Sequence, residues 1–202
     1  MKKLILAAIR CSLMFTAVAA LSIACPAKAN LVTNGNFETG DFTGWTVTHA
    51  PSGSHIFVDH GPGPDTTFGA FFGATGRTFD SISQALTTTP GAFYTLTFFY
   101  QVTNLGMPIP ANNGFDVLWN GVSIGGGLFP QFDVNPGFGT FTFHLQATSA
   151  LTTLEFDGRN APSFDFLDNV SVVAGVPDGG STVSLLGFGL LGLAALRRKL
   201  GC

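Results

Sequence analysis

The middle of this chain alternates apolar and polar residues with a period of two, and this spacing restricts its possible folds more than any other feature. Between Phe93 and Val102, apolar side chains at 94, 96, 98, 100 and 102 share one face, and threonine and glutamine are prominent on the other. Residues 140–147 repeat the pattern. Successive side chains of a strand point to opposite faces, so this spacing predicts strands with one buried face. Residues 30–176 contain no convincing 3.6-residue apolar period, which argues against helices there.

Turn-forming residues separate the predicted strands. Asn120-Gly121 lies between two short apolar runs, and this pair tolerates the positive φ of a type I′ hairpin turn. Further strands are predicted at residues 31–37, 44–49, 55–59, 67–73, 78–87, 151–157 and 166–173. About ten short strands separated by turn-forming residues predict an all-β fold, an antiparallel jelly-roll sandwich. Nineteen of the 21 phenylalanines lie in residues 30–176, where their rings would fill the ~10 Å gap between two sheets.

Charge is distributed unevenly along the 202 residues, whose formal net charge is −3. The first 29 residues carry four basic side chains and no acid, and the last 26 carry three basic side chains and one acid. Residues 30–176 carry two arginines, no lysine and eleven acids, a net charge of −9. No Lys/Arg patch is available to neutralise phosphates, so the composition argues against a nucleic-acid partner.

The N-terminal segment has the pattern of a secretory signal. Lys2 and Lys3 precede a mostly apolar stretch over residues 4–23. The small residues Ala27 and Ala29 stand at the two positions that signal peptidase reads. We therefore expect residues 1–29 to form a signal helix that signal peptidase removes after Ala29. The alternatives are a retained membrane anchor and a lipoprotein cut before Cys25.

The C-terminal segment, residues 176–202, has three parts in order. A break rich in turn residues comes first, then fourteen uncharged, mostly apolar residues at 183–196, then a basic cluster. As a helix the apolar part would span about 21 Å, short of the ~30 Å hydrocarbon core. A basic cluster beside an apolar stretch stays on the cytoplasmic side, so residues 30–175 would lie outside. The break is Val176, Pro177, Asp178, Gly179, Gly180, Ser181 and Thr182, and the cluster is Arg197, Arg198 and Lys199.

This tail resembles the PEP-CTERM class of bacterial sorting tails in its VPDGGST-type variant. The resemblance implies recognition by an exosortase-like membrane protease, processing near the motif and transient anchoring in the inner membrane by the C-terminal helix. It also implies delivery to the cell surface or the extracellular matrix. The alternative is a plain C-terminal membrane anchor.

The region 30–175 is predicted to be one β-sandwich domain, and three short segments spread along it resemble galactose-binding-like jelly rolls, which include carbohydrate-binding modules. The similarity rests on residues 30–40 with Gly44-Trp45, on residues 81–96, and on residues 166–172 as a closing strand. In that group the first and last strands often hold a structural Ca²⁺. The matching positions are Glu38 and Asp168, since a hard cation prefers carboxylate and carbonyl oxygens. The alternative makes Glu38 a turn acid and Asp168 a strand-end acid bonded to backbone.

Sugar binding would need exposed aromatic rings beside polar groups. The candidates are Trp119, Tyr94 and Tyr100, with Asn112 and Asn113 nearby, whereas Trp45 is expected in the core. No nucleophile motif is present, the acids of residues 30–176 are scattered, and His49, His55 and His60 match no metal-ligand spacing. The sequence thus favours an exported, non-catalytic surface or matrix protein with a structural or adhesive role in exopolysaccharide. The alternatives are a carbohydrate-binding module with a glycan pocket and, third, a secreted glycoside-active enzyme.

Overall fold

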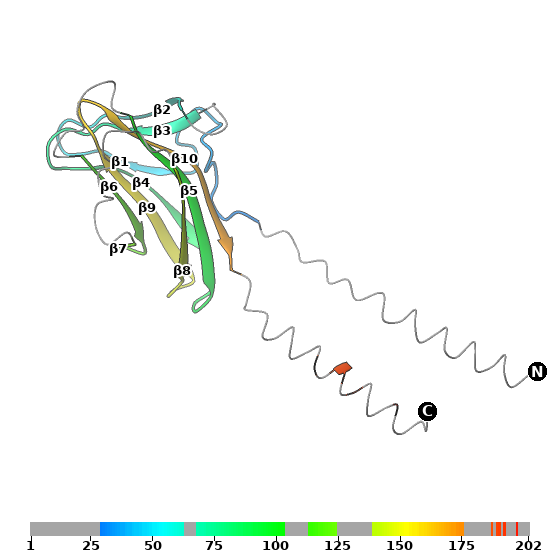
Figure 1. Ribbon diagram of the computed structural model, residues 1–202. Coiled ribbons are helices and arrows are strands. Elements are labelled where there is room, and N and C mark those ends of the chain that lie inside the picture. Colours follow the sequence, from blue (N-terminus) through cyan, green and yellow to red (C-terminus); the bar gives the residue numbers. More distant parts are fainter. Residues whose placement is uncertain are drawn as a thin grey trace, which may run out of the picture.

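Ten strands build the folded part of the chain in the computed structural model (Figure 1). The structure describes residues 29–62, 68–103, 113–124 and 139–175, together with residues 187, 189, 190, 192 and 197. The strands are β1 (Thr46–Thr48), β2 (Ile56–His60), β3 (Phe68–Phe72), β4 (Asp80–Thr87), β5 (Phe93–Thr103), β6 (Gly114–Trp119), β7 (Val122–Ser123), β8 (Gly139–Gln146), β9 (Leu151–Arg159) and β10 (Phe164–Ala174). The prediction of an all-β chain region is therefore confirmed.

The strands form two five-stranded antiparallel sheets. The first, sheet A, has the order β1-β4-β9-β6-β7, and the second, sheet B, has the order β2-β3-β10-β5-β8. Only β2–β3 and β6–β7 follow each other within one sheet, and every other connection passes between the sheets. This repeated exchange gives the predicted antiparallel sandwich. The Asn120-Gly121 hairpin is also confirmed, with φ of 54° and 77° at its two residues.

Apolar side chains from the facing sides of the two sheets form the main core. All five apolar residues of the alternating run in β5, from Tyr94 to Val102, are buried as predicted. Phe156 of β9 bridges the layers, because its ring centroid lies 5.3 Å from that of Phe98 in β5 and 6.1 Å from that of Phe115 in β6. Aromatic packing of this kind accounts for part of the high phenylalanine content.

Sheet B also buries phenylalanine on its outer face. Phe57, Phe71 and Phe166 lie opposite one another across β2, β3 and β10 and form a second cluster, to which Phe99 and Phe164 belong. The Phe166 ring covers the backbone of Gly69, where a Cβ would come within 2.3 Å of it. The phenylalanines therefore fill two cores, and alternation alone predicted only the one between the sheets.

The predicted strand at 31–37 is wrong. This opening loop turns instead, because Asn34 and Phe37 have positive φ values of 50° and 54°. The N–H of Phe37 donates to the carbonyl of Asn34, and the N–H of Gly40 donates to that of Phe37. The loop reaches β10 through single backbone hydrogen bonds and not through a strand ladder: the Leu31 N–H, for example, donates to the Val172 carbonyl at 2.8 Å.

The predicted signal helix lies outside the described residues, as does the break at 176–182. In the tail, residues 187, 189, 190 and 192 and Arg197 are helical. Among the residues that the structure describes, no helix is long and apolar enough to cross a membrane.

Candidate functional site

The opening loop is fixed against an irregularity in β10. The register between β10 and β5 shifts between Asp168 and Ser171, and Asn169 has a positive φ of 51°. There the N–H of Val170 donates to the carbonyl of Gly35 at 2.8 Å. A Cβ at position 35 would lie 2.0 Å from the Val170 carbonyl oxygen, so only glycine fits at this contact.

Replacing Gly35 with alanine is therefore expected to cost about 1–3 kcal/mol of unfolding free energy, the usual cost of forcing atoms into a packed site. Urea unfolding measures this cost. Gly139→Ala is the matched control, because a Cβ there meets only ordinary contacts at 3.7 Å. Equal stability of the two variants would contradict the close contact between the loop and β10.

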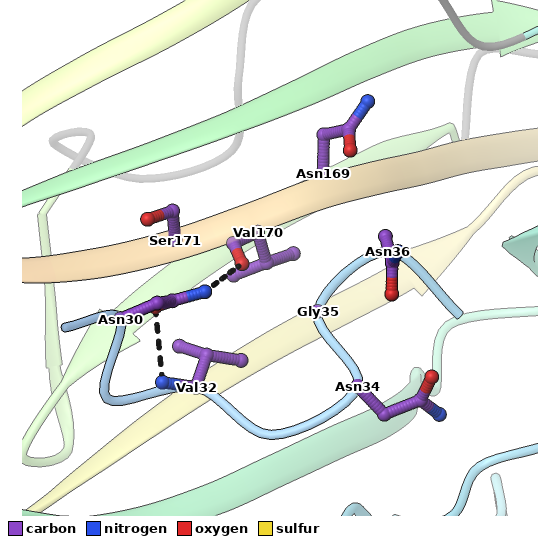
Figure 2. A pocket seen from close by; sticks show the side chains of 8 residues that line it. All are labelled: Asn30, Val32, Asn34, Gly35, Asn36, Asn169, Val170 and Ser171. Atoms are coloured by element: carbon purple, nitrogen blue, oxygen red, sulfur yellow. Dashed lines mark hydrogen bonds between the residues drawn. The ribbon is translucent and has the colours of Figure 1, made fainter. Parts of the chain in front are cut away.

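A polar cavity of about 300 Å³ lies between this loop and β10 (Figure 2). Its lining residues are Asn30, Val32, Asn34, Gly35, Asn36, Asn169, Val170 and Ser171. The side chain of Asn30 makes its hydrogen bonds within the protein. Its Oδ1 accepts from the N–H groups of Val32 and Val172, and its Nδ2 donates to the Val170 carbonyl. Asn34 donates to the carbonyls of Asp41 and Thr43, which closes the loop on itself.

The side chains of Asn36 and Asn169 make no hydrogen bond to other described residues. Each carboxamide offers a neutral acceptor oxygen and two donor hydrogens. Such groups can bind sugar hydroxyls, and their oxygens can also join a hard cation. The cavity therefore suits a small neutral polar ligand better than an anion or an apolar one.

The two carboxylates predicted to hold Ca²⁺ lie beside the first half of β3. Glu38 is exposed, and its Oε1 accepts the N–H of Phe68 at 3.1 Å. Asp168 is fully buried, follows Leu167, which pairs with Ala70, and accepts the Asn169 N–H at 2.6 Å. Their oxygens are of the type that Ca²⁺ prefers. In the described part of the chain, no group of three His, Cys, Asp or Glu side chains is arranged to hold a metal ion.

The aromatic rings predicted to bind sugar are buried, so their expected exposure is wrong. Trp119, Tyr94 and Tyr100 expose 7%, 5% and 2% of their surfaces. Their polar atoms are used internally, with the Trp119 indole donating to the Gln146 carbonyl at 3.0 Å. Because strand alternation turns all three rings toward the opposite sheet, they offer no face to a sugar.

The sugar-binding prediction also named Asn112 and Asn113, and it placed Trp45 in the core. Trp45 is in the core, as expected, and its indole donates to the Asn34 carbonyl. Asn113 is buried, and Asn112 lies outside the described residues.

The outer face of sheet A brings three acids together. Asp116 and Asp157 lie opposite each other on β6 and β9, and Glu155 is two residues from Asp157 on the same face. Burial raises the pKa of both Glu155 and Asp157, and in each case the negative charge of a neighbouring carboxylate raises the pKa further. This cluster of acids was not predicted from the sequence, because Asp116 approaches the other two only when β6 pairs with β9.

Another acid, Asp165 of β10, lies in the main core between the sheets. Asp165 is fully buried and accepts the hydroxyl hydrogen of Tyr100 at 2.8 Å and an amide hydrogen of Asn160 at 3.4 Å. Burial raises the pKa of Asp165 well above its ordinary value, although these hydrogen bonds oppose the rise. Burial and the negative charge of Asp165 likewise raise the pKa of Tyr100.

The fold defines a class, that of two-sheet sandwiches found in carbohydrate-binding and adhesin modules. The K3 cleaved adhesin domain of Lys-gingipain from Porphyromonas gingivalis is similar at a TM-score of 0.55 and 13% identity, over 74% of this chain and 100% of that one. The CBM22-1 xylan-binding domain of Paenibacillus barcinonensis Xyn10C gives a TM-score of 0.50 at 13% identity, over 75% of this chain and 97% of that one. At such identities the likeness shows the fold alone.

A third similar structure belongs to a much longer protein. The enzymatically active domain of bacteriophage CBA120 tailspike protein 4 gives a TM-score of 0.55 at 12% identity, over 72% of this chain. The match spans only 21% of the tailspike chain. No curated protein sequence matches this chain significantly.

The tail carries the more specific likeness. Residues 175–200 match the family model of the VPDSG-CTERM motif, a PEP-CTERM-like sorting tag. The match begins directly after the last residue of β10, Ala174. The resemblance of the tail to such sorting tails is confirmed, and the chain is a β-sandwich followed by a segment that matches a sorting-tag motif.

Proposed function

We propose that this chain is an exported, non-catalytic protein that an exosortase-like system delivers to the cell surface or the extracellular matrix. The observation that carries the proposal is the VPDSG-CTERM match at residues 175–200, immediately after the sandwich. On arrival the sandwich would act as a structural or adhesive component of exopolysaccharide. The adhesin-like fold supports this role.

Cell fractionation tests the proposal. The unaltered chain is expected at the surface or in the medium, whereas a chain with Arg197, Arg198 and Lys199 replaced by glutamine is expected to lose that location. A control with Arg77→Gln keeps the same type of change within the sandwich. Equal surface delivery of all three chains would contradict sorting by the tail.

We also propose that Glu38 and Asp168 hold a structural Ca²⁺ between the opening loop and β10. Ca²⁺ would supply positive charge to these carboxylates and tie the loop to the strand. Its binding is expected to raise the melting temperature, by an amount equivalent to about 2.7 kcal/mol when free Ca²⁺ is a hundredfold above its Kd.

The calcium effect is expected to vanish in Glu38→Gln and to persist in Glu155→Gln, the change at the other glutamate of the chain. Thermal unfolding with Ca²⁺ and with a chelator measures it. A melting temperature that neither addition alters would show that no such site exists.

Glycan binding is the second candidate function, and the polar cavity favours it. Asn36 and Asn169 are among its lining residues, and the same fold carries a xylan-binding domain in another protein. Retention on polysaccharide columns that Asn36→Ala and Asn169→Ala abolish would support this candidate. Retention that survives both changes would place any glycan contact elsewhere.

A further inference from the structure

Among the sandwich residues that the structure describes, the three most exposed large apolar side chains gather at one end. Phe93, Val122 and Leu151 expose 59%, 67% and 60% of their surfaces and are the exposed large hydrophobics of the described sandwich. Each directly follows a turn: residues 88–92 before β5, Asn120-Gly121 before β7, and residues 147–150 before β9. We call this set of turns and side chains the tail-side end.

Hydrogen bonds show that these turns lie together. The N–H of Thr88 donates to the Ala150 carbonyl, and the N–H of Gly91 donates to that of Ala147. The Asn120 side chain donates to the Thr148 hydroxyl at 3.4 Å, which joins the third turn to the other two. Figure 1 shows β10 ending at this same end, and the Gly175 N–H donates to the Phe93 carbonyl.

The tail-side end carries no charge in its described turns. The turns and the residues that flank them, 88–93, 120–122, 147–151 and 174–175, contain no Asp, Glu, Lys or Arg. The opposite end is different: Arg159, at the far end of β9 from Leu151, donates to the Arg77 carbonyl at 2.8 Å. Both arginines of the acidic region therefore lie about nine strand residues, or roughly 30 Å, from the uncharged end.

The short segment that follows β10 limits how far the tail-side end can lie from the apolar stretch of the tail. Only seven residues, 176–182, separate Gly175 from the apolar stretch at 183–196, and fully extended they reach about 25 Å. If that stretch enters a bilayer, the tail-side end stays close to the lipid surface. A domain with eleven acids and two arginines is repelled by anionic headgroups, and an uncharged apolar end minimises that repulsion.

We propose that the tail-side end rests on the lipid bilayer surface while the chain is anchored by its tail, with Phe93, Val122 and Leu151 in the interfacial layer. This inference rests on the proposed sorting function, together with the transient anchoring by the tail that the resemblance to PEP-CTERM tails implies. Docking would fix the sandwich upright and hold the sorting motif at the height of the membrane surface.

Lipid-quenching fluorescence tests the proposal on the chain from Asn30 to Cys202, with Cys202→Ser to leave one labelling site. An environment-sensitive dye is placed at Val122→Cys or, as the matched control, at Arg77→Cys. The protein is reconstituted in phosphatidylethanolamine–phosphatidylglycerol vesicles whose lipids carry a nitroxide near the headgroup. Quenching is expected to be at least twofold stronger at position 122 than at 77. Phe93→Ser with Leu151→Ser is expected to remove most of the difference.

Flotation of the same vesicles distinguishes a failure of anchoring by the tail from a failure of docking by the tail-side end. Protein that does not float lacks the anchored state, which overturns this part of the proposed function and the docking with it. Protein that floats but shows equal quenching at both positions overturns the docking alone. If the dye at position 122 is shielded from water in proportion to protein concentration and independently of lipid, the docking is overturned and contact between copies of the chain explains the shielding.

Discussion

Replacing Phe156 with alanine is expected to lower the free energy of unfolding by about 3–5 kcal/mol. The ring is fully buried in β9 and contacts Trp45, Phe98 and Phe115, so it joins the opening loop to both sheets. Its removal leaves a cavity that three other rings line, and such a site collapses poorly. Urea unfolding followed by fluorescence measures the loss.

Phe93→Ala is the matched control for this prediction. It removes the same ring from a site that is 59% exposed, so a change within about 0.5 kcal/mol is expected. Similar losses in the two variants would contradict the assignment of Phe156 to the core between the sheets.

The second large effect concerns pH. The sandwich is expected to gain stability as the pH falls from 8 toward 5, because burial raises the pKa of Asp165 well above its ordinary value. In the unfolded chain an aspartate titrates near pH 3.9, so the folded chain binds more protons between the two pKa values. The stabilisation is complete below about pH 4 and is lost as the pH rises through the folded-state pKa. Each unit of difference is worth about 1.4 kcal/mol.

Asp165→Asn is expected to reduce this dependence, since an amide oxygen still accepts from Tyr100 and cannot ionise. Glu155 and Asp157 contribute in the same direction and would leave a remainder. Asp41→Asn is the control, because hydrogen bonds from Thr43 and Thr39 lower the pKa of Asp41. Its contribution to stability therefore changes only near and below pH 4, and this variant should leave the dependence between pH 5 and 8 unchanged. Unfolding curves from pH 4 to 8 give the comparison, and a dependence that Asp165→Asn leaves intact would contradict the role of Asp165.

Local patterns were sufficient to predict most of the strands. In β5 and β8 the alternation identifies the buried face, and Asn120-Gly121 identifies a hairpin, because both signals depend only on neighbouring residues. The opening loop was mistaken for a strand, since its apolar residues do not reveal that Asn34 and Phe37 adopt positive φ. That conformation depends on the contact of Gly35 with β10, more than 130 residues away in the sequence.

The candidate sites depend more strongly on long-range pairing. A turn beside Trp119 suggested exposure, yet its indole reaches the Gln146 carbonyl on the neighbouring sheet. The row of Asp116, Glu155 and Asp157 exists only because β6 pairs with β9 in one register. The sorting tag, by contrast, is a linear motif, so its residues could be identified in the sequence without knowledge of the fold.

Mass spectrometry of the intact protein recovered from the cell surface tests the central claim most directly. Export and sorting predict a chain that begins at Asn30 and ends near residues 176–182, without the basic cluster. A surface protein that retains Arg197, Arg198 and Lys199 would contradict processing of the tail and leave it as a plain anchor.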